Sequence, residues 1–215
     1  MSASLRITEI FRSLQGEAST VGYPTVFVRL TGCPLRCVYC DSEYAFYGGE
    51  RQSITDILAK VQETPTKYVC VTGGEPLAQP DVHVLMAELC ERGYSVSLET
   101  SGAMDISQVD PRVSVVMDLK TPASGEQSRN RWQNIDLLQK KDQLKFVICN
   151  RDDFDWMCFK LDEHQLSERV SNVLVSPSYG QVDAAVLAEW LLSSGRNLRF
   201  QVQLHKQLWG DKPGV

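Results

Sequence analysis

The chain has 215 residues, a length that suits one domain or at most two small ones. Its 43% hydrophobic and 23% charged residues are ordinary for a globular protein, and a net charge of −5 argues against non-specific binding of nucleic acid. The start "MSASLRITEIF" has no unbroken apolar core, and no apolar run approaches about 18 residues, so we expect no secretory signal and no membrane span. The seven cysteines are an odd number, so a complete set of disulfides is not expected. The cysteine content favours the reducing cytosol, where clustered thiols indicate metal binding or catalysis.

Short β-branched runs alternate with helical patterns almost throughout the chain. These runs are unbroken rather than alternating, which suits strands buried on both faces of a parallel sheet. The predicted strands are residues 25–30, 68–72, 95–99, 113–118, 144–149, 173–176 and 198–203.

Three helices are predicted between the strands. The first begins at a capping box of Ser53 and Asp56, followed by apolar residues at helical spacing. The second has Pro80 as its first residue and ends at Gly93, and the third covers residues 182–194 and ends at Gly195. Residues 121–130 are predicted to be a polar loop, and residues 207–215 an irregular tail that is too short to pack as another helix.

The repeated strand–helix order predicts an α/β fold with right-handed crossovers. About six β/α units fall short of a closed eightfold barrel of about 250 residues, so we expect a partial, open parallel barrel. In such folds the active site lies beyond the carboxyl ends of the strands. The cysteine loop and the stretches "TGGEP", "ETSG" and "DLKTP" each follow a strand directly, and all four are therefore expected at one mouth.

The loop "GCPLRCVYC" contains three cysteines spaced CxxxCxxC, Cys33, Cys37 and Cys40. Thiolates are soft ligands that bind zinc, copper or iron–sulfur clusters. A structural zinc site takes four closed ligands, and an all-thiolate cubane cluster normally takes four cysteines. Three cysteines would leave one iron open to a ligand from outside the protein. The other four are predicted to pack in the core as small apolar side chains, Cys70, Cys90, Cys149 and Cys158.

This motif resembles that of the radical S-adenosylmethionine (SAM) enzymes, which implies a [4Fe–4S] cluster with SAM on its open iron. "TGGEP" is similar to their GGE motif, in which glycines let the backbone approach SAM and Glu75 would accept from its ammonium group. "DLK" lies where relatives contact the polar end of SAM, and Tyr39 would shield the cluster and contact adenine. The cofactor-binding residues implied by the resemblance are Tyr39, Cys40, Asp41, Gly73, Gly74, Glu75, Asp118, Leu119 and Lys120.

"SLQGEAST", "FVRLTGCPLRCVYCDSEYAF" and "QLHKQLWG" together resemble the 7-carboxy-7-deazaguanine synthase family along essentially the whole chain. That resemblance implies a lyase that converts 6-carboxy-5,6,7,8-tetrahydropterin to 7-carboxy-7-deazaguanine with loss of ammonia, assisted by Mg²⁺, in deazapurine (queuosine) biosynthesis. It also implies a cytoplasmic homodimer with a flavodoxin- or ferredoxin-like electron donor and no nucleic-acid or membrane partner. Residues 1–215 would form one radical SAM domain, with an N-terminal segment on the substrate and a C-terminal tail closing the barrel mouth.

The resemblance also assigns substrate contacts. Arg29 would bind the substrate carboxylate, which would be the anion that balances this buried cation. The hydroxyl of Ser42 would bind Mg²⁺. The remaining substrate contacts would be Leu14, Gln15, Gly16, Thr72 and the terminal carboxylate of Val215. Three positions depart from the family pattern: Ser42 replaces a threonine, Ala18 a glycine, and "DLK" a more common "SPK".

Other interpretations stay open at this point. "DLK" also occurs in activases of glycyl-radical enzymes, and a non-enzymatic zinc module would use the same cysteines. Gln15 and Glu17 could form a plain turn, Arg29 a structural ion pair and Ser42 a turn cap. His205 and Lys206 could lie at the edge of the site or on the surface, and the tail could simply be frayed.

Overall fold

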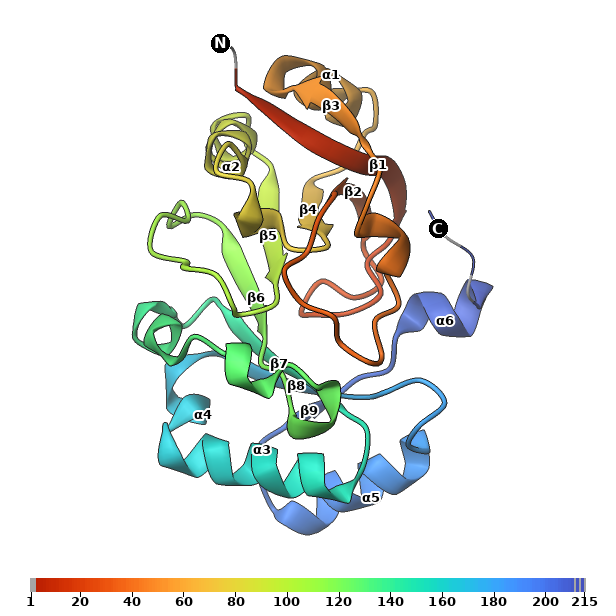
Figure 1. Cartoon of the computed structure of the whole chain (residues 1–215), viewed down its shortest axis with the longest axis vertical. Helices are drawn as coiled ribbons and strands as arrows, with labels where there is room; N and C mark the ends of the chain where they lie inside the picture. The colour runs from red at the N-terminus through yellow and green to blue at the C-terminus, as the bar shows by residue number, and fades with distance from the viewer. Residues whose placement is uncertain (1–2, 211, 213, 215) are drawn as a thin grey trace.

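A curved sheet of nine strands forms the centre of the computed structural model, which describes residues 3–210, 212 and 214 (Figure 1). The order is β3-β1-β2-β4-β5-β6-β7-β8-β9, and the two end strands are not paired with each other, so the barrel is open. From β2 to β9 all neighbours are parallel, whereas β1 pairs antiparallel with both β2 and β3. The strands are β1 (Ser4–Leu14), β2 (Pro24–Leu30), β3 (Glu50–Ser53), β4 (Tyr68–Gly73), β5 (Ser95–Thr100), β6 (Ser114–Asp118), β7 (Gln143–Ile148), β8 (Asn172–Pro177) and β9 (Arg199–Phe200).

The seven predicted strands are confirmed, and they are the parallel strands β2 and β4–β9. The last is shorter than predicted because, after the backbone N–H of Gln201 bonds Val175, the chain turns away towards the mouth. Two antiparallel strands were missed. β1 alternates buried Leu5 and Ile7 with exposed Arg6, a pattern of a half-covered strand. β3 is a polar edge strand, "ERQS", whose sequence contains no apolar signal.

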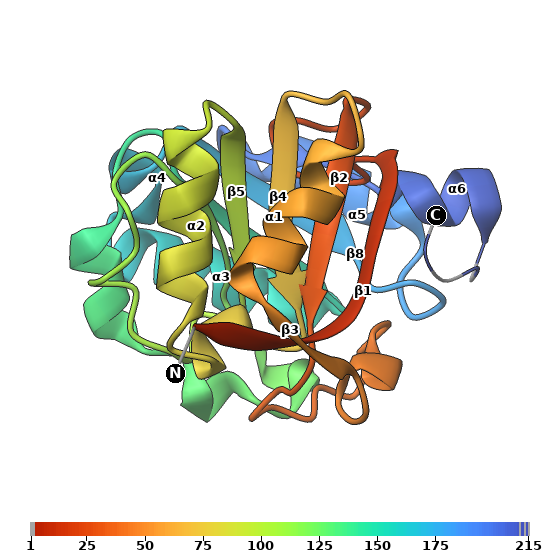
Figure 2. The same ribbon diagram turned by 90° about the horizontal axis from the view of Figure 1, so that it is seen from above.

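Helices cover the outer face of the sheet, and Figure 2 shows α1 and α2 lying across β4 and its neighbours. The capping box of α1 is confirmed, since Ser53 Oγ accepts from the Asp56 N–H at 3.1 Å. Helix α2 begins after Asp81, so Pro80 was wrong as its first residue, whereas the ends at Gly93 and Gly195 are confirmed by their positive φ angles. The helices are α1 (Ile54–Gln62), α2 (Val82–Glu91), α3 (Arg151–Glu163), α4 (Leu166–Arg169), α5 (Ala184–Ser194) and α6 (Leu204–Trp209).

Two helical segments differ from expectation. Helix α3 was not predicted, although Phe154, Met157 and Leu161 form its buried stripe and Asn150 caps its first turn. Helix α6 corrects the prediction of an irregular tail, because residues 204–209 are helical and its first N–H, at Leu204, bonds the carbonyl of Gly16. Short 3-10 turns occupy the polar loop (Pro122–Ser124 and Gln127–Arg129) and three other connections (Glu43–Ala45, Pro76–Ala78 and Trp132–Leu137).

The four cysteines predicted for the core are confirmed there. Cys70 and Cys149 are buried, and Cys90 and Cys158 pack, partly buried, against the main cluster of apolar side chains. Across the described residues, every helix is too short or too polar to traverse a lipid bilayer.

The connection between β1 and β2 crosses the open barrel on the side of the amino ends of the parallel strands, since it joins Leu14 to Pro24 at the start of β2. The Ser19 N–H donates to Gln143 Oε1 at 2.8 Å, and the Ala18 N–H donates to Gln201 Oε1 at 3.0 Å. These bonds join the amino-terminal hairpin to β7 and to the segment after β9, on the far side of the sheet. Ala18 adopts a left-handed backbone with φ of +63° and is 1% exposed against Val116 and Leu174. Glycine, which the resemblance implies at this position, would adopt this backbone without strain.

Substitutions at Ala18 should separate backbone strain from packing. Ala18→Gly relieves a left-handed strain of about 1–2 kcal/mol but loses a buried methyl group of about 0.8 kcal/mol, so its free energy of unfolding should stay within about 1 kcal/mol of wild type. Ala18→Val adds β-branching and volume at the same place and should cost about 2–4 kcal/mol. Urea unfolding measures both. A valine variant as stable as the glycine variant would show that the turn is not held as described.

Candidate active site

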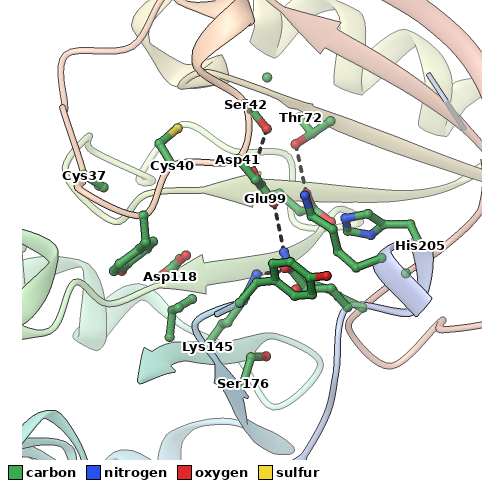
Figure 3. A pocket seen from close by; sticks show the side chains of 18 of the residues that line it. Cys37, Cys40, Asp41, Ser42, Thr72, Glu99, Asp118, Lys145, Ser176 and His205 are labelled. Carbon is green, nitrogen blue, oxygen red and sulfur yellow. Dashed lines mark hydrogen bonds and ion pairs between the residues drawn. The ribbon is translucent and has the colours of Figure 1, made fainter. Parts of the chain in front are cut away.

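A cavity of about 710 Å³ lies at the carboxyl ends of the parallel strands. The cysteine loop and the segments after β4, β5 and β6 all line it, so the prediction that these four motifs share one mouth is confirmed. Figure 3 shows Cys37 and Cys40 on one side, His205 on the other, and Asp41, Glu99 and Thr72 between them. The cavity is large enough for a cofactor and a small substrate together.

The three loop cysteines are free thiols that line one wall of the cavity and are only partly exposed. Burial raises the pKa of all three, that of Cys37 to about 11. Each thiol is therefore protonated at neutral pH and must release a proton when a metal binds.

The glycines of "TGGEP" are required by the packing of the protein itself. A Cβ at Gly73 would lie 2.3 Å from the carbonyl oxygen of Leu30, and one at Gly74 would lie 2.2 Å from that of Gly32. The Gly74 N–H bonds Leu30 and the Glu75 N–H bonds Gly32, so this turn is laid directly against the start of the cysteine loop. The resemblance accounts for these glycines by the approach of SAM alone. The structure adds a tighter constraint, which is contact with the neighbouring backbone.

Replacing Gly74 should therefore damage the protein before any ligand is added. Gly74→Ala forces two backbone segments apart and should lower the free energy of unfolding of the metal-free protein by about 2 kcal/mol or more. Gly93→Ala is the matched control, because Gly93 has a positive φ but open space around it, and should cost about 1 kcal/mol. Thermal unfolding compares the two. If Gly74→Ala unfolds like wild type and only SAM binding suffers, the approach of SAM alone is a sufficient explanation.

Glu75 is buried and its carboxylate is fully engaged within the protein. It accepts hydrogen bonds from the backbone of Leu77, the hydroxyl of Thr100, and both the backbone and hydroxyl of Ser101. It does not line the cavity. Leu119 is likewise a core residue, 0% exposed, and its side chain does not line the cavity. Both residues hold the motif turns in place rather than facing the ligand space.

Asp118 and Lys120 form an ion pair at the cavity wall, with Nζ 3.0 Å from Oδ2. Asn130 fixes the backbone of Lys120 through hydrogen bonds to its N–H and its carbonyl. Burial opposes the charge of Lys120, but Asp118 and the nearby thiols outweigh it and raise the pKa. The amine also lies 5.8 Å from the ring centroid of Tyr39. Asp118 thus gives Lys120 a counter-ion within the same motif.

Arg29 lines the cavity and already has an anionic partner. Its Nε–H donates to Glu9 Oε1 at 2.7 Å, and the rings of Phe11 and Tyr44 lie 5.8 and 5.7 Å from its guanidinium carbon. Our inference that the substrate must balance this charge is therefore wrong as an argument, because Glu9 on the adjacent strand balances it. Glu9 also accepts from the Tyr44 hydroxyl at 2.8 Å.

Two of the polar residues predicted to contact substrate, Gln15 and Thr72, converge on Glu99. Its two carboxylate oxygens accept from Gln15 Nε2 at 3.4 Å and from Thr72 Oγ1 at 2.9 Å. Leu14 and Gly16 line the same region, and a Cβ at Gly16 would lie 2.6 Å from His205 Nδ1. A side chain at position 16 would therefore have to displace the ring of His205, whereas the His205 backbone nitrogen lies at 3.5 Å, an ordinary contact.

Ser42 and Asp41 lie between the cysteine loop and the carboxyl-terminal segment. Ser42 Oγ donates to Asp41 Oδ1 at 2.8 Å, and Gln203 Nε2 donates to Asp41 Oδ2 at 2.9 Å. Enclosure disfavours the ionised carboxylate, yet the charge of Lys145 and these two hydrogen bonds lower the pKa of Asp41. The predicted contact from Val215 lies outside the described residues.

Several cavity residues were missed or left open by the sequence interpretation. Glu17 and Lys145 form an ion pair facing the cavity, and burial raises the pKa of Glu17 in spite of that cation. Ser176 lies near the carboxyl end of β8, and that position was the available signal. Lys145 lies in the middle of β7, so its place in the strand gave no such signal. His205 and Lys206, left undecided between site and surface, line the cavity.

Unpaired polar atoms indicate that the cavity is built for a polar ligand. Buried atoms with no hydrogen-bond partner in the described part of the chain include Glu17 Oε1, the Tyr39 hydroxyl, Asp118 Oδ1 and Ser176 Oγ, and all four residues line the cavity. Such atoms are costly unless a ligand or water satisfies them. The three thiols beside them are the kind of ligand that an iron–sulfur cluster takes. The residues therefore fit a cluster together with a polar cofactor.

Comparisons with known proteins agree with this chemistry. The sequence profile of the radical SAM superfamily matches residues 27–116. The chain is 42% identical to 7-carboxy-7-deazaguanine synthase of Koribacter versatilis, covering 95% of this chain and 97% of the relative, and 39% identical to that of Chlorobaculum tepidum, covering 99% and 98%. The crystal structure of QueE from Escherichia coli shares the fold, with a TM-score of 0.77 at 24% identity over 94% of this chain and 95% of that one. The chain belongs to the 7-carboxy-7-deazaguanine synthase family of radical SAM proteins.

Proposed function

We propose that this protein converts 6-carboxy-5,6,7,8-tetrahydropterin to 7-carboxy-7-deazaguanine with loss of ammonia, in deazapurine (queuosine) biosynthesis. The observation that carries the proposal is that three free thiols lie beside unpaired polar atoms in the same cavity. The family membership of the chain supports the same reaction.

Cys33, Cys37 and Cys40 would hold a [4Fe–4S] cluster, and the backbone of Gly73 and Gly74, Tyr39, and the Asp118–Lys120 pair would hold SAM. When bound, these groups supply the radical chemistry that removes a hydrogen atom from the substrate. The protein must then exclude water and orient the pterin. The turn through Gly16 and Ala18, which is tied to the far side of the barrel, would provide that closure.

On the opposite side, Gln15, Thr72 and Glu99 would read the donor and acceptor edge of the pterin, and Leu14 would pack on its ring. The terminal nitrogens of Arg29 would bind the substrate carboxylate while its Nε remains on Glu9. Loss of ammonia requires a proton at the departing nitrogen. Glu17 and Lys145 face the cavity and form a pair that can hold and return one.

Mg²⁺ would bind at the Ser42 hydroxyl together with substrate oxygens, because Mg²⁺ takes few protein ligands. Asp41 would orient that hydroxyl by accepting its proton in a hydrogen bond. Ser42→Ala should raise the Mg²⁺ concentration needed for half-maximal turnover about tenfold without abolishing the reaction. Ser42→Thr retains the oxygen and is the control. A Mg²⁺ requirement unaltered in the alanine variant would assign Ser42 to capping its turn.

Further features are proposed from the resemblance and the sequence. The reaction would take place in the reducing cytosol, which suits seven free cysteines, with electrons from a flavodoxin- or ferredoxin-like donor. The chain would act as one domain and as a homodimer. The segment through α6 would close the mouth over the pterin, since it contacts the substrate side at Gly16 and Asp41, and Val215 would add its carboxylate.

Substrate-dependent cleavage of SAM tests the proposal. In protein reconstituted with iron and sulfide without oxygen, adding the carboxypterin should accelerate formation of 5′-deoxyadenosine and consume the pterin. A glycyl-radical activase would ignore the pterin and would place a protein radical on a partner, visible by electron paramagnetic resonance. Indifference of SAM cleavage to the pterin would reject the proposed substrate.

A further inference from the structure

Arg36 lies inside the cysteine motif, and its side chain folds back onto the loop that contains it. One terminal nitrogen donates to the carbonyl oxygens of Cys33 at 2.8 Å and of Leu35 at 2.6 Å. The other donates to the Tyr47 hydroxyl at 3.1 Å. The guanidinium carbon also lies 4.3 Å from the ring centroid of Phe46, within the range of a cation–π contact.

The backbone of the same loop is held from its other side. The Arg36 N–H donates to Glu126 Oε1 at 2.6 Å, and the Val38 N–H donates to the carbonyl of Ser124 at 3.1 Å. The loop is therefore braced between residues 43–47 and the segment after β6. None of these hydrogen bonds uses the thiol of a motif cysteine as a donor, so the sulfur atoms stay available to iron.

The chemistry of the guanidinium explains how Arg36 alone can contact two carbonyl oxygens, a hydroxyl and an aromatic ring. A guanidinium is planar, always charged, and donates in several directions at once, whereas a lysine ammonium is a single point that cannot stack flat on a ring. Its charge lies beside the cysteine motif, since one terminal nitrogen is within 2.8 Å of the carbonyl oxygen of Cys33. Hydrogen bonds and charge around an iron–sulfur cluster are what set its reduction potential.

We propose that Arg36 is a positioning residue for the cluster: it fixes the loop between Cys33 and Cys37 before iron binds, and its charge raises the reduction potential of the bound cluster. The inference rests on the cluster-binding role proposed above. It makes Arg36 act through the carbonyl of Cys33 and through its electrostatic field. No contact with substrate is involved.

The test measures the cluster itself, without turnover. Arg36→Gln, Arg36→Lys and the control Arg92→Gln, an exposed arginine at the end of α2, are reconstituted without oxygen. Iron release to a chelator is followed by absorbance, and the midpoint potential by a redox titration with electron paramagnetic resonance. Arg36→Gln should release iron about 10- to 100-fold faster and show a lower potential. Arg36→Lys should release iron nearly as fast as Arg36→Gln, but its midpoint potential should lie closer to that of wild type. Arg92→Gln should match wild type in both measurements.

Tyr47→Ala guards against a folding defect, because Tyr47 is 74% exposed and its loss removes a partner of Arg36 without touching the core. Like Arg36→Gln, the Tyr47→Ala variant should release iron faster than wild type. Wild-type rates and potentials in Arg36→Gln would overturn the role of Arg36, as would an effect of equal size in Arg92→Gln. Wild-type protein that takes up no iron would instead overturn the proposed function, and this inference with it.

Discussion

Alanine at Cys33, Cys37 or Cys40 should abolish the iron–sulfur absorbance and reduce 5′-deoxyadenosine formation below detection. Each thiol would supply the bond to one iron, and no further cysteine lines the cavity to replace it within the described residues. The thiols belong to one short loop laid against the "TGGEP" turn, so losing one leaves an incomplete set with fixed geometry.

Cys158→Ala is the matched control for these variants, because Cys158 is a free cysteine on α3 that packs against the core away from the cavity. It should retain the full complement of iron and sulfide. Iron and sulfide analysis after reconstitution without oxygen makes the comparison. A full cluster in Cys37→Ala would contradict the assignment of the motif.

Arg29→Ala should weaken binding of the carboxypterin by about 30- to 3,000-fold while leaving the cluster and basal SAM cleavage in place. Removing one partner of a desolvated, hydrogen-bonded charge pair costs about 2–5 kcal/mol, and each 1.4 kcal/mol is a factor of ten. The side chain of Arg29 is 15% exposed, and its exposure is to the cavity, so the substrate carboxylate would meet it largely free of water.

Glu9 provides the control that separates binding from structure. Glu9→Gln retains the shape of the side chain and removes the anion that now balances Arg29. If Arg29 binds substrate, the glutamine variant should bind the pterin as well as wild type or better, because the competing anion is gone. If the pair is purely structural, both variants should lose stability and pterin affinity together. Titration of the cluster-loaded protein with the pterin in the absence of reductant measures the affinity.

The parallel part of the fold could be predicted because its signal is local. Strands buried on both faces consist of apolar runs, and all seven were visible. The same sequence order placed the cysteines, "TGGEP", "ETSG" and "DLK" at successive strand ends, which was sufficient to predict one shared mouth. β3 could not be predicted, because a polar edge strand is identified only by the partner it pairs with, here β1.

The features that the sequence could not show are contacts between distant segments. The pairing of Arg29 with Glu9 depends on the antiparallel register of β1 and β2, and the need for glycine at position 74 depends on the approach of the cysteine loop. Helix α6 is placed by its hydrogen bond to Gly16 rather than by a pattern of its own. In each case the position of the residue or helix is explained by a contact with a segment that lies far away in the chain.

The identity of the product is the measurement that tests the central claim most directly. Cluster-loaded protein is incubated without oxygen with SAM, a reductant, Mg²⁺ and 6-carboxy-5,6,7,8-tetrahydropterin, and the mixture is analysed by mass spectrometry alongside an ammonia assay. The account predicts 7-carboxy-7-deazaguanine and ammonia in equal amounts, neither of which should form with Cys37→Ala. Cleavage of SAM with the pterin recovered unchanged would contradict it.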